Sequence, residues 1–442
     1  MRSVRSLSSK SGRKSKMKTQ VAKTEEKVLG SLRVGHIRVG SLKISAPGFM
    51  ATLCGPEDLK ALLLGEVPRT EIHGIVISQH NADSIRHAAR RHDENLIVGE
   101  GIKWGTFRRG KAVLFDPASE VFYLAKPELR KKLSAMPGAP GNFFARMIDV
   151  NTDNHVTLWN DAIESGEYLA VLTWQKNLQM GVGGSSIVVP LTPFIDGSTS
   201  GSVKSCLNAN LIASGILKDL LGVPHAMYFG INYCAFKDAS VSETIFSTLY
   251  VHLKSKPKPD VIVVKIRGLP NAGIEDKSER MGFVARFMES MGLLSEEFKI
   301  PVFLLNAGSY GLAALEYGFN SFSEKLNGSF ADDPDPDSIT GMPKNRQYGS
   351  VYDPVKKTNI SWDEYVKQTN PHPQVEFSSP PDPTDVSTTN FRLHAKHYRA
   401  AARGAEVHKI IESVFDENPR GLAEEFQRSK ACNVQKLLKN PI

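Results

Sequence analysis

The sequence predicts an α/β fold, specifically a (β/α)₈ barrel of the TIM type that carries insertions and is followed by a C-terminal helical segment. The clearest observation is residues 298–328, where an apolar run at 302–305 leads into a polar loop, a helical pattern and a second short strand at 321–323. The same alternation extends back to about residue 40 and gives about eight strands in total. An open, doubly wound sheet is the alternative. No G-x-G-x-x-G follows the first strand, which argues against a dinucleotide-binding site.

Short apolar runs rich in β-branched residues identify the strands, and amphipathic stretches identify the helices between them. Strands are expected within 39–53 and at 74–78, 96–100, 169–173, 187–191, 226–232, 261–267, 302–305 and 321–323. Helices are expected at 55–64, 85–91, 156–164 and 203–221, from 240 onward, at 280–291 and at 312–318. Residues 106–115 are expected to form a hairpin insertion, and the proline-containing residues 116–153 an insertion over one end of the barrel.

Local signals support several of these helix boundaries. Pro56 lies at the first helical position, where its missing N–H has no consequence. Ser240-x-x-Glu243 has the spacing of a capping box, and Gly318 can adopt the left-handed conformation that ends a helix.

The barrel, assigned to residues 28–330, is flanked by segments of different composition. Residues 1–27 are expected to be a disordered basic tail, because they contain too few apolar residues to form a core. Residues 331–385 are expected to be an acidic, proline-rich connector with a small ordered island around 352–365. Residues 386–442 are expected to be helical. Their apolar positions alternate at spacings of four and three: Leu393, His397, Ala400, Gly404, Val407, Ile411 and Val414.

The positive charge of the chain is concentrated in the tail. Residues 1–27 contain nine Lys and Arg against two Glu, a net charge of +7 out of +8 for the whole chain. Such a tail attracts nucleic-acid phosphates or anionic lipid through salt-sensitive forces. A passive solubilising extension is the alternative interpretation.

The four cysteines and the hydropathy pattern predict a cytoplasmic protein without a membrane span. Cys54, Cys206, Cys234 and Cys432 are far apart and form no C-x-x-C, so neither a zinc ribbon nor a disulfide framework is expected, and no metal ligands are assigned. No apolar run approaches the roughly 18 residues that cross a bilayer.

In a TIM-type barrel, the residues just past each strand share one end of the barrel and form the active site. Carboxylates held among cations there can acquire the shifted pKa values that acid–base catalysis requires. The candidate catalytic residues are Glu100, Asp196, Lys265 and Glu324. The candidate substrate-binding residues are His80, Asn81, Lys176, Asn232, Arg267 and Asn306. For Lys265 in particular, a structural ion pair is the competing interpretation, because a charge buried in a strand needs a partner.

A loop of small residues between a predicted strand and helix is a candidate phosphate site. It contains Gly197, Ser198, Gly201 and Ser202, whose backbone N–H groups could bind an anion at the helix N-terminus. The loop lacks the G-x-x-x-x-G-K-[ST] pattern, so no nucleotide-triphosphate loop is assigned, and a flexible turn is the alternative.

The C-terminal helix also carries basic residues at helical spacing. Arg392, Lys396, Arg399 and Arg403 follow one another at intervals of four, three and four, which predicts a basic ridge that could bind nucleic-acid phosphates. A solvated face paired with the acidic residues 332–337 is an equally good interpretation.

The stretch Asn306-Ala307-Gly308, followed by Leu312 and then Gly318-Phe319-Asn320-Ser321-Phe322-Ser323, resembles the closing strands of the tRNA-guanine transglycosylase family. That resemblance implies a barrel that exchanges a base in nucleic acid, with an aspartate nucleophile in the last strand. Asn320 and Ser323 stand where the family has acids, and its clustered Cys and His zinc ligands are missing. Glu324 is the nearest replacement carboxylate.

Together these observations predict a barrel enzyme that acts on an anionic substrate, either phosphate-bearing or linked to nucleic acid, with nucleobase exchange as one possibility. Lys176, Lys265 and Arg267 would bind the anion, and Glu100, Asp196 or Glu324 would act as base or nucleophile. The alternative is a non-enzymatic nucleic-acid-binding or assembly protein that uses the barrel as a scaffold. The cofactor and the oligomeric state are left unassigned.

Overall fold

The computed structural model of this chain describes most of the residues between 27 and 420. The described residues are 27–29, 32–63, 72–96, 101–122, 131, 134–149, 155–182, 184–197, 200–255, 258–269, 279–326, 350–355, 358–368, 373–375, 378–384, 388–418 and 420. The predicted tail before residue 27 and the acidic residues 332–337 lie outside this part of the chain, as do Glu100, Ser198 and the expected last helix after residue 421.

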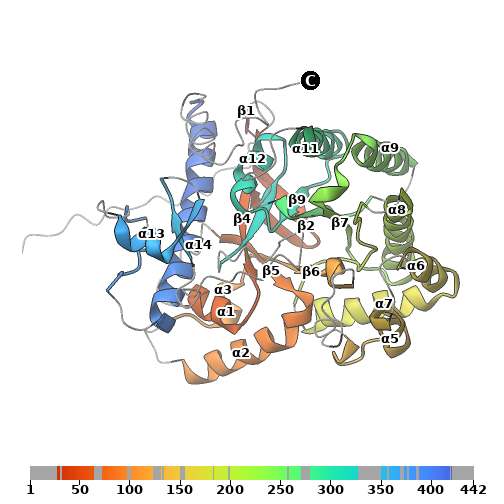
Figure 1. Ribbon diagram of the computed structural model, residues 1–442, viewed down its shortest axis with the longest axis horizontal. Coiled ribbons are helices and arrows are strands. Elements are labelled where there is room, and N and C mark those ends of the chain that lie inside the picture. The colour runs from red at the N-terminus through yellow and green to blue at the C-terminus, as the bar shows by residue number, and fades with distance from the viewer. Residues whose placement is uncertain are drawn as a thin grey trace, which may run out of the picture.

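The centre of the molecule is a curled sheet of seven parallel strands in the order β6-β5-β4-β10-β9-β8-β7 (Figure 1). The strands are β4 (Gly48–Leu53), β5 (Ile72–Ser78), β6 (Ala112–Asp116), β7 (Ala226–Asn232), β8 (Val261–Arg267), β9 (Val302–Leu305) and β10 (Ser321–Lys325). The first and last of these strands along the chain, β4 and β10, are neighbours, with Phe49 beside Phe322. The chain therefore closes on itself at the middle of the sheet, and its two edges are β6 and β7.

Residues 185–195 lie between these two edges. Val188 and Ile195 form parallel bridges to His225 and Ile231 at β7. On the other side, the Ser185 hydroxyl donates to the Val113 carbonyl of β6. Along much of this segment, side chains and not a neighbouring strand form the hydrogen bonds to the backbone.

Two glutamines form most of these side-chain hydrogen bonds. The Gln179 amide accepts from Val189 N at 2.7 Å and donates to Val189 O at 2.8 Å, while Gln175 Oε1 accepts from Leu191 N at 2.8 Å. Buried backbone groups that lack a ladder partner would otherwise remain unsatisfied, at a cost of about 1–3 kcal/mol each. Gln79, at the end of β5, accepts from Gln175 Nε2 at 3.0 Å and joins this network to the sheet.

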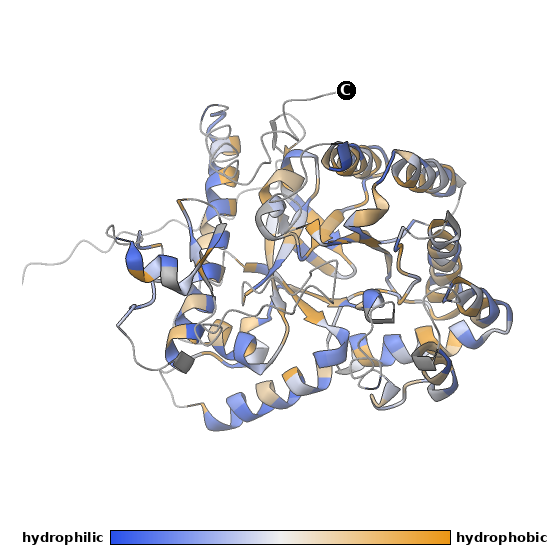
Figure 2. Cartoon of the chain, viewed as in Figure 1, coloured by the Kyte–Doolittle hydropathy of each residue, from blue (hydrophilic) through white to orange (hydrophobic). Residues whose placement is uncertain are grey.

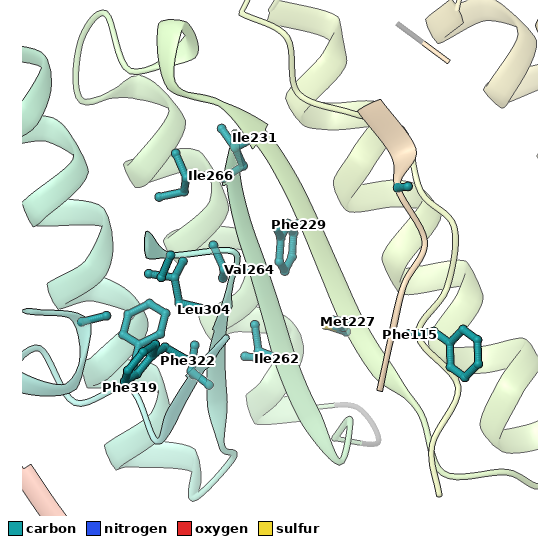
Figure 3. Packing of buried hydrophobic residues seen from close by; sticks show 14 of the residues in the cluster. Phe115, Met227, Phe229, Ile231, Ile262, Val264, Ile266, Leu304, Phe319 and Phe322 are labelled. Carbon is teal, nitrogen blue, oxygen red and sulfur yellow. The ribbon is translucent and has the colours of Figure 1, made fainter. Parts of the chain in front are cut away.

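The strands are apolar on both faces, as expected for a parallel sheet with both faces covered. The outward face packs against helices, and Figure 3 shows this packing along β7 and β8. The labelled residues there are Met227, Phe229, Ile231, Ile262, Val264 and Ile266. Each such side chain contributes about 1.5–3 kcal/mol when it is fully buried. The inward face forms a second cluster, which includes Met50, Val76, Leu114, Val189 and Val263.

Helices surround the outer face of the sheet (Figure 1). They are α1 (Pro56–Leu63), α2 (Ala82–Asn95), α3 (Trp104–Phe107), α5 (Gly141–Asp149), α6 (His155–Glu164), α7 (Glu167–Lys176), α8 (Ser200–Gly215), α9 (Ser240–Ser255), α11 (Glu279–Phe298) and α12 (Gly311–Glu316). Hydrophilic residues colour their outer faces in Figure 2, most clearly along α2, whereas the strands are predominantly hydrophobic. None of the helices in the described ranges is long and apolar enough to cross a membrane.

An antiparallel unit precedes the parallel sheet. It consists of β1 (Lys27–Leu29), β2 (Leu32–Val39) and β3 (Leu42–Ala46). Val39 and Ile44 join the inward-facing cluster, so this unit covers that cluster at one end. The single strand expected within 39–53 is therefore two strands, β3 and β4, which belong to different sheets.

Three of the predicted elements are wrong. The strand expected at 187–191 is only an isolated bridge between Val188 and His225. Residues 169–173, expected to be a strand, belong to helix α7, and the buried positions Tyr168, Val171, Leu172 and Gln175 have helical spacing. Residues 112–115, expected to belong to a hairpin insertion, form β6 in the main sheet instead. A hairpin needs an antiparallel partner, but β6 pairs with β5 in parallel.

The C-terminal region packs beside the sheet as one long helix and a small ordered unit. The helix is α14 (Thr388–Phe415), and the unit contains β11 (Ser350–Asp353), β12 (Thr358–Ser361) and α13 (Trp362–Lys367). These short elements lie at the position expected for the small island around 352–365. Its apolar side chains, which include Val351, Ile360 and Tyr365, pack mainly on Phe391 and Ala395 of α14.

Candidate functional site

Polar and charged side chains replace the apolar inward-facing residues at the carboxyl ends of the strands. On β8 the inward positions Val261 and Val263 are followed by Lys265, and on β6 Leu114 is followed by Asp116. Lys265 lies beside Leu305 of β9, the last residue before the turn that contains Asn306. The alternation of side chains along each strand therefore brings ionisable groups together above an apolar layer.

Five residues form this group, here called the Asp116 cluster: Asp116, Glu120, Tyr228, Lys265 and Asn306. The Lys265 ammonium donates to Asp116 Oδ2 at 2.7 Å and also to the Glu120 carboxylate. Asn306 Nδ2 donates to Asp116 Oδ2 at 3.3 Å, and the Tyr228 hydroxyl donates to Asp116 Oδ1 at 3.3 Å. Ala118 N completes the set with a bond of 3.0 Å to Oδ1.

The cluster is buried, since Asp116 and Lys265 are only 1% and 2% exposed. Burial by itself raises the pKa of Asp116, but the Lys265 charge and its hydrogen bond outweigh that effect and leave the pKa below its ordinary value. Burial and the neighbouring carboxylates of Asp116 and Glu120 raise the pKa of Tyr228 well above the ordinary value. The phenol consequently stays protonated and acts as a donor, whereas Asp116 stays a carboxylate.

The backbone of Asn306 has an uncommon conformation that aims its amide at Asp116. Its φ is +53°, in the left-handed region where asparagine is tolerated better than most residues. Asn306 N donates to Ser323 Oγ at 3.0 Å, and Thr52 donates to the same hydroxyl at 2.9 Å. Strands β4 and β10 thereby fix the turn after β9, and that turn places the Asn306 side chain in the cluster.

Of the residues predicted to share this end of the barrel, the structure brings Lys265 and Asn306 into the cluster. Arg267 is buried two positions beyond Lys265 on the same strand. Asn232 accepts from Cys234 N at 3.0 Å, and Asn81 donates to Cys54 O at 2.6 Å, so both side chains are engaged in local backbone contacts. His80 lies in the short turn that follows β5.

Lys176 and Asp196 lie apart from the described contacts of the cluster. Lys176 is in the last turn of α7, because the segment before it is a helix and not the predicted strand. Asp196 follows Ile195 in the segment beside β7 and is half-buried.

Glu324 does not point toward the cluster. It is inward-facing Ser323 that contacts Asn306, so Glu324, one position later, points to the opposite face of β10. There it pairs with Arg399 and, at 2.6 Å, with Arg403 of α14. Burial raises the pKa of Glu324, but the two guanidinium groups lower it further and leave the net pKa below the ordinary value.

The predicted basic ridge is an ion-pair seam that joins α14 to the sheet and not an exposed surface. Lys396 pairs with Asp58 at 2.8 Å and Arg392 with Glu57 at 3.3 Å. Arg403 is fully buried and donates to Glu324, Glu406, Tyr352 and the Gly308 carbonyl. The expectation of exposed cations fails because their charges are used inside the protein, with Arg392 the most exposed of the four at 35% of its side chain.

The predicted phosphate loop has only some of the expected features. Gly197 has a φ of +82°, and a Cβ at this position would lie 2.5 Å from Ala235 Cα, so the turn requires glycine for close packing. Gly201 and Ser202 belong to the first turn of α8, and Ser202 is buried. The described part of this loop is therefore explained by packing against the residues that follow β7.

Sequence reasoning missed Asp116, Glu120 and Tyr228. Asp116 directly follows the apolar run Ala112–Phe115, which is the same signal that identified Lys265 and Asn306. The hairpin interpretation of that run removed it from the set of barrel strands. Tyr228 lies in the middle of an apolar strand, where its hydroxyl gives no signal in sequence.

Neither similarity to known proteins nor a metal-binding group assigns a function to the cluster. No protein-family model matches the chain, and no curated protein matches it significantly. Within the part of the chain that the structure describes, no three His, Cys, Asp or Glu side chains are grouped so that they could hold a metal ion.

Proposed function

We propose that this protein is an enzyme of the (β/α)₈ barrel type that uses Lys265 and Asp116 for acid–base chemistry on an anionic substrate. The observation that carries the proposal is the buried contact of 2.7 Å between Lys265 Nζ and Asp116 Oδ2 at the carboxyl ends of β8 and β6. Charges buried at the ends of parallel strands are costly unless they serve a site or have good partners. In barrel enzymes that end of the sheet carries the active site.

The barrel in this proposal has eight strand positions. The seven parallel strands occupy seven of them, and residues 185–195 occupy the eighth. Bridges to β7 and the Ser185 bond to β6 support this arrangement. So does the apolar cluster on the inner face, in which Ile187 and Val189 pack with residues of β4, β5, β6, β7, β8 and β9.

The charge of the site supports an anionic substrate. Lys265, Arg267 and Lys325 lie on the inward positions at the carboxyl ends of β8 and β10, against the two carboxylates of the cluster. These cations give that end of the sheet groups that can bind an anion. Lys265 would exchange the Glu120 carboxylate for the substrate anion and donate one proton to a basic atom of the substrate. The neutral amine would take up a proton again from solvent when product leaves.

Nucleobase exchange, which the transglycosylase resemblance implies, is the more specific form of this proposal. Ser323 takes the place of that family's nucleophilic acid, and its hydroxyl is engaged with Thr52 and Asn306 N. Asn306 links that position to Asp116, since its backbone N–H donates to Ser323 and its side chain donates to Asp116. Asp116 would therefore take the role that the resemblance gives to the last-strand acid.

The test compares Lys265→Gln with Lys396→Gln, because Lys396 also forms a close lysine–aspartate pair but on the opposite face of the sheet. Incorporation of labelled guanine into tRNA measures base exchange, and thermal stabilisation by phosphate and nucleoside monophosphates measures anion binding. We expect Lys265→Gln to lower the exchange rate by about 100-fold or more and to abolish the stabilisation, with Lys396→Gln retaining both.

If the wild-type protein shows neither base exchange nor anion-dependent stabilisation, the enzymatic proposal fails and the non-enzymatic scaffold is favoured. If anions stabilise the wild type but no base exchange is detected, the proposed anion-binding site is supported and the transglycosylase form of the proposal is rejected. Equal losses in the two lysine variants would mean that Lys265 has only a structural role.

A further inference from the structure

A pocket of about 430 Å³ lies between α2 and α3, away from the Asp116 cluster. Its walls contain three arginines, two carboxylates and one indole, contributed by Arg86, Arg90, Arg108, Asp93, Glu94 and Trp104. Helix α2 returns from the carboxyl end of β5, and α3 precedes the start of β6. Helix α3 and the second half of α2 therefore lie toward the amino-terminal end of the sheet. This is the end opposite the proposed active site.

Trp104 is fixed through both its backbone and its ring. Asp93 Oδ1 accepts from Trp104 N at 2.8 Å and ties α3 to the last turns of α2. The ring stacks on Phe107, with centroids 6.1 Å apart and planes inclined by 19°, and Phe107 is itself buried. A fixed and half-buried aromatic ring loses little conformational freedom when a ligand packs on it.

Two of the three arginines come from α2 and the third follows α3. Arg86 and Arg90 are one helical turn apart on α2, so their side chains project from the same face. Arg108 follows α3 and packs on Gly184, where an added Cβ would lie 2.4 Å from one of its guanidinium nitrogens. Glycine at 184 thus leaves the space that the Arg108 side chain occupies.

The ion pairs of these arginines are weak enough to be exchanged for a ligand. Arg90 pairs with Glu94 at 2.7 Å, but their side chains are 77% and 55% exposed. Exposed pairs of this kind contribute about 0.2–1 kcal/mol, and Arg86 pairs with Asp83 in a similar setting. A phosphate can accept two parallel N–H bonds from a guanidinium and would replace a solvated carboxylate.

We propose that this pocket binds a nucleotide, with the base stacked on Trp104 and the phosphate held by Arg86 and Arg90. An aromatic ring beside arginines is the combination that proteins use for single nucleotides and for the units of single-stranded nucleic acid. Exposed Lys103 and Arg109 flank α3 and extend the positive charge beyond the pocket. This site is separate from the proposed active site, and its occupancy does not depend on Lys265.

Binding is measured on the full-length protein with two probes. Uridine and adenosine monophosphates are followed by calorimetry, and a fluorescein-labelled single-stranded oligonucleotide is followed by anisotropy at several salt concentrations. The mononucleotides report on the pocket with little contribution from the basic N-terminal tail. The variants are Arg86→Gln, Arg90→Gln, Trp104→Leu and, as matched control, Arg146→Gln, because Arg146 is an exposed arginine of α5 paired with Glu167.

We expect the wild type to bind at least one probe, and each pocket variant to weaken that binding about tenfold or more. Arg146→Gln and Lys265→Gln should bind as the wild type does. Preference for the oligonucleotide would identify single-stranded nucleic acid as the source of the nucleotide, and preference for the monophosphates a free nucleotide.

Three results would overturn the proposal. They are absence of binding to both probes at millimolar concentration, equal weakening in Arg146→Gln, and binding of inorganic phosphate as tight as that of the nucleotides. The last result would remove the role of the indole. Because Arg86 and Arg90 are exposed, we expect their replacement to leave folding intact, and the thermal unfolding midpoint of every variant separates loss of binding from unfolding.

Discussion

His397 on α14 lies in surroundings that disfavour its charged, protonated form. Its Nδ1 lies 3.0 Å from Ser378 Oγ, and burial, together with the nearby His394, lowers its pKa from 6.5 to about 4. Well above pH 6.5 the imidazole is neutral in both folded and unfolded chains, so it adds no pH dependence to the stability there. As the pH falls toward 4, the unfolded chain takes up a proton that the folded chain refuses, and stability decreases by up to about 3 kcal/mol.

We therefore predict that His397→Gln flattens the acid side of the stability profile. The apparent free energy of unfolding by urea, measured between pH 7 and pH 4, should fall less steeply in this variant than in the wild type. His408→Gln is the control, because the His408 side chain is 53% exposed. Parallel profiles for wild type and His397→Gln would show that His397 is protonated in the folded state over this range.

Individual residues of the candidate site were predictable only where a strand was correctly identified. Lys265 and Asn306 follow recognisable apolar runs, so their place at one end of the sheet could be inferred from sequence. Glu324 could not be placed by its strand alone, because one step in register decides between the cluster and α14. The partners Arg399 and Arg403 are about 75 residues away in sequence, and only the packing of α14 shows that they neutralise Glu324.

Helix α11 contains two glycines in different surroundings, and they test how closely elements pack. A Cβ at Gly292 would lie 1.8 Å from the Tyr317 carbonyl, in the turn between α12 and β10, whereas a Cβ at Gly282 would meet nothing within 4 Å. The turn cannot move away easily, because Gly318 has a φ of +90° and Phe319 N donates to Ala314 O at 3.1 Å.

We predict opposite signs for the two alanine substitutions. Gly292→Ala should destabilise the protein by about 1–3 kcal/mol through overpacking, and Gly282→Ala should stabilise it by about 0.5–1 kcal/mol through helix propensity. Thermal unfolding followed by far-ultraviolet circular dichroism measures both. A neutral or stabilising Gly292→Ala would mean that α11 can shift relative to the turn.

At the scale of elements, periodicity distinguishes correct from wrong predictions. Strands β7, β8 and β9 are short apolar runs with no competing helical pattern, and each was predicted within about one residue. The run at 169–173 has the same composition, yet Tyr168, Val171, Leu172 and Gln175 recur at three and four. The helical signal appears only when the window is widened beyond the apolar run.

The whole molecule depends on the contact between α14 and the curled sheet. Both ends of the described chain meet there: α14 packs on α1, β4 and β1, and the ordered unit of β11, β12 and α13 packs on α14. The alternation of strands and helices predicted the α/β class and the parallel sheet. It could not predict this contact, because ion pairs such as Arg403 with Glu324 join residues that no local pattern connects.

We predict that Glu324→Gln destabilises the protein by about 3–5 kcal/mol, because it leaves the buried guanidinium groups of Arg399 and Arg403 without their shared carboxylate. Glu57→Gln is the matched control, since Glu57 also contacts two cations of α14 but its side chain is 50% exposed, and we expect a change of at most about 1 kcal/mol. Urea unfolding gives both values, and hydrogen exchange measured on peptides from α14 and β10 shows whether the two elements open together. Equal effects of the two substitutions, or exchange of α14 at wild-type rates in Glu324→Gln, would contradict a fold in which this buried charge holds the C-terminal helix against the sheet.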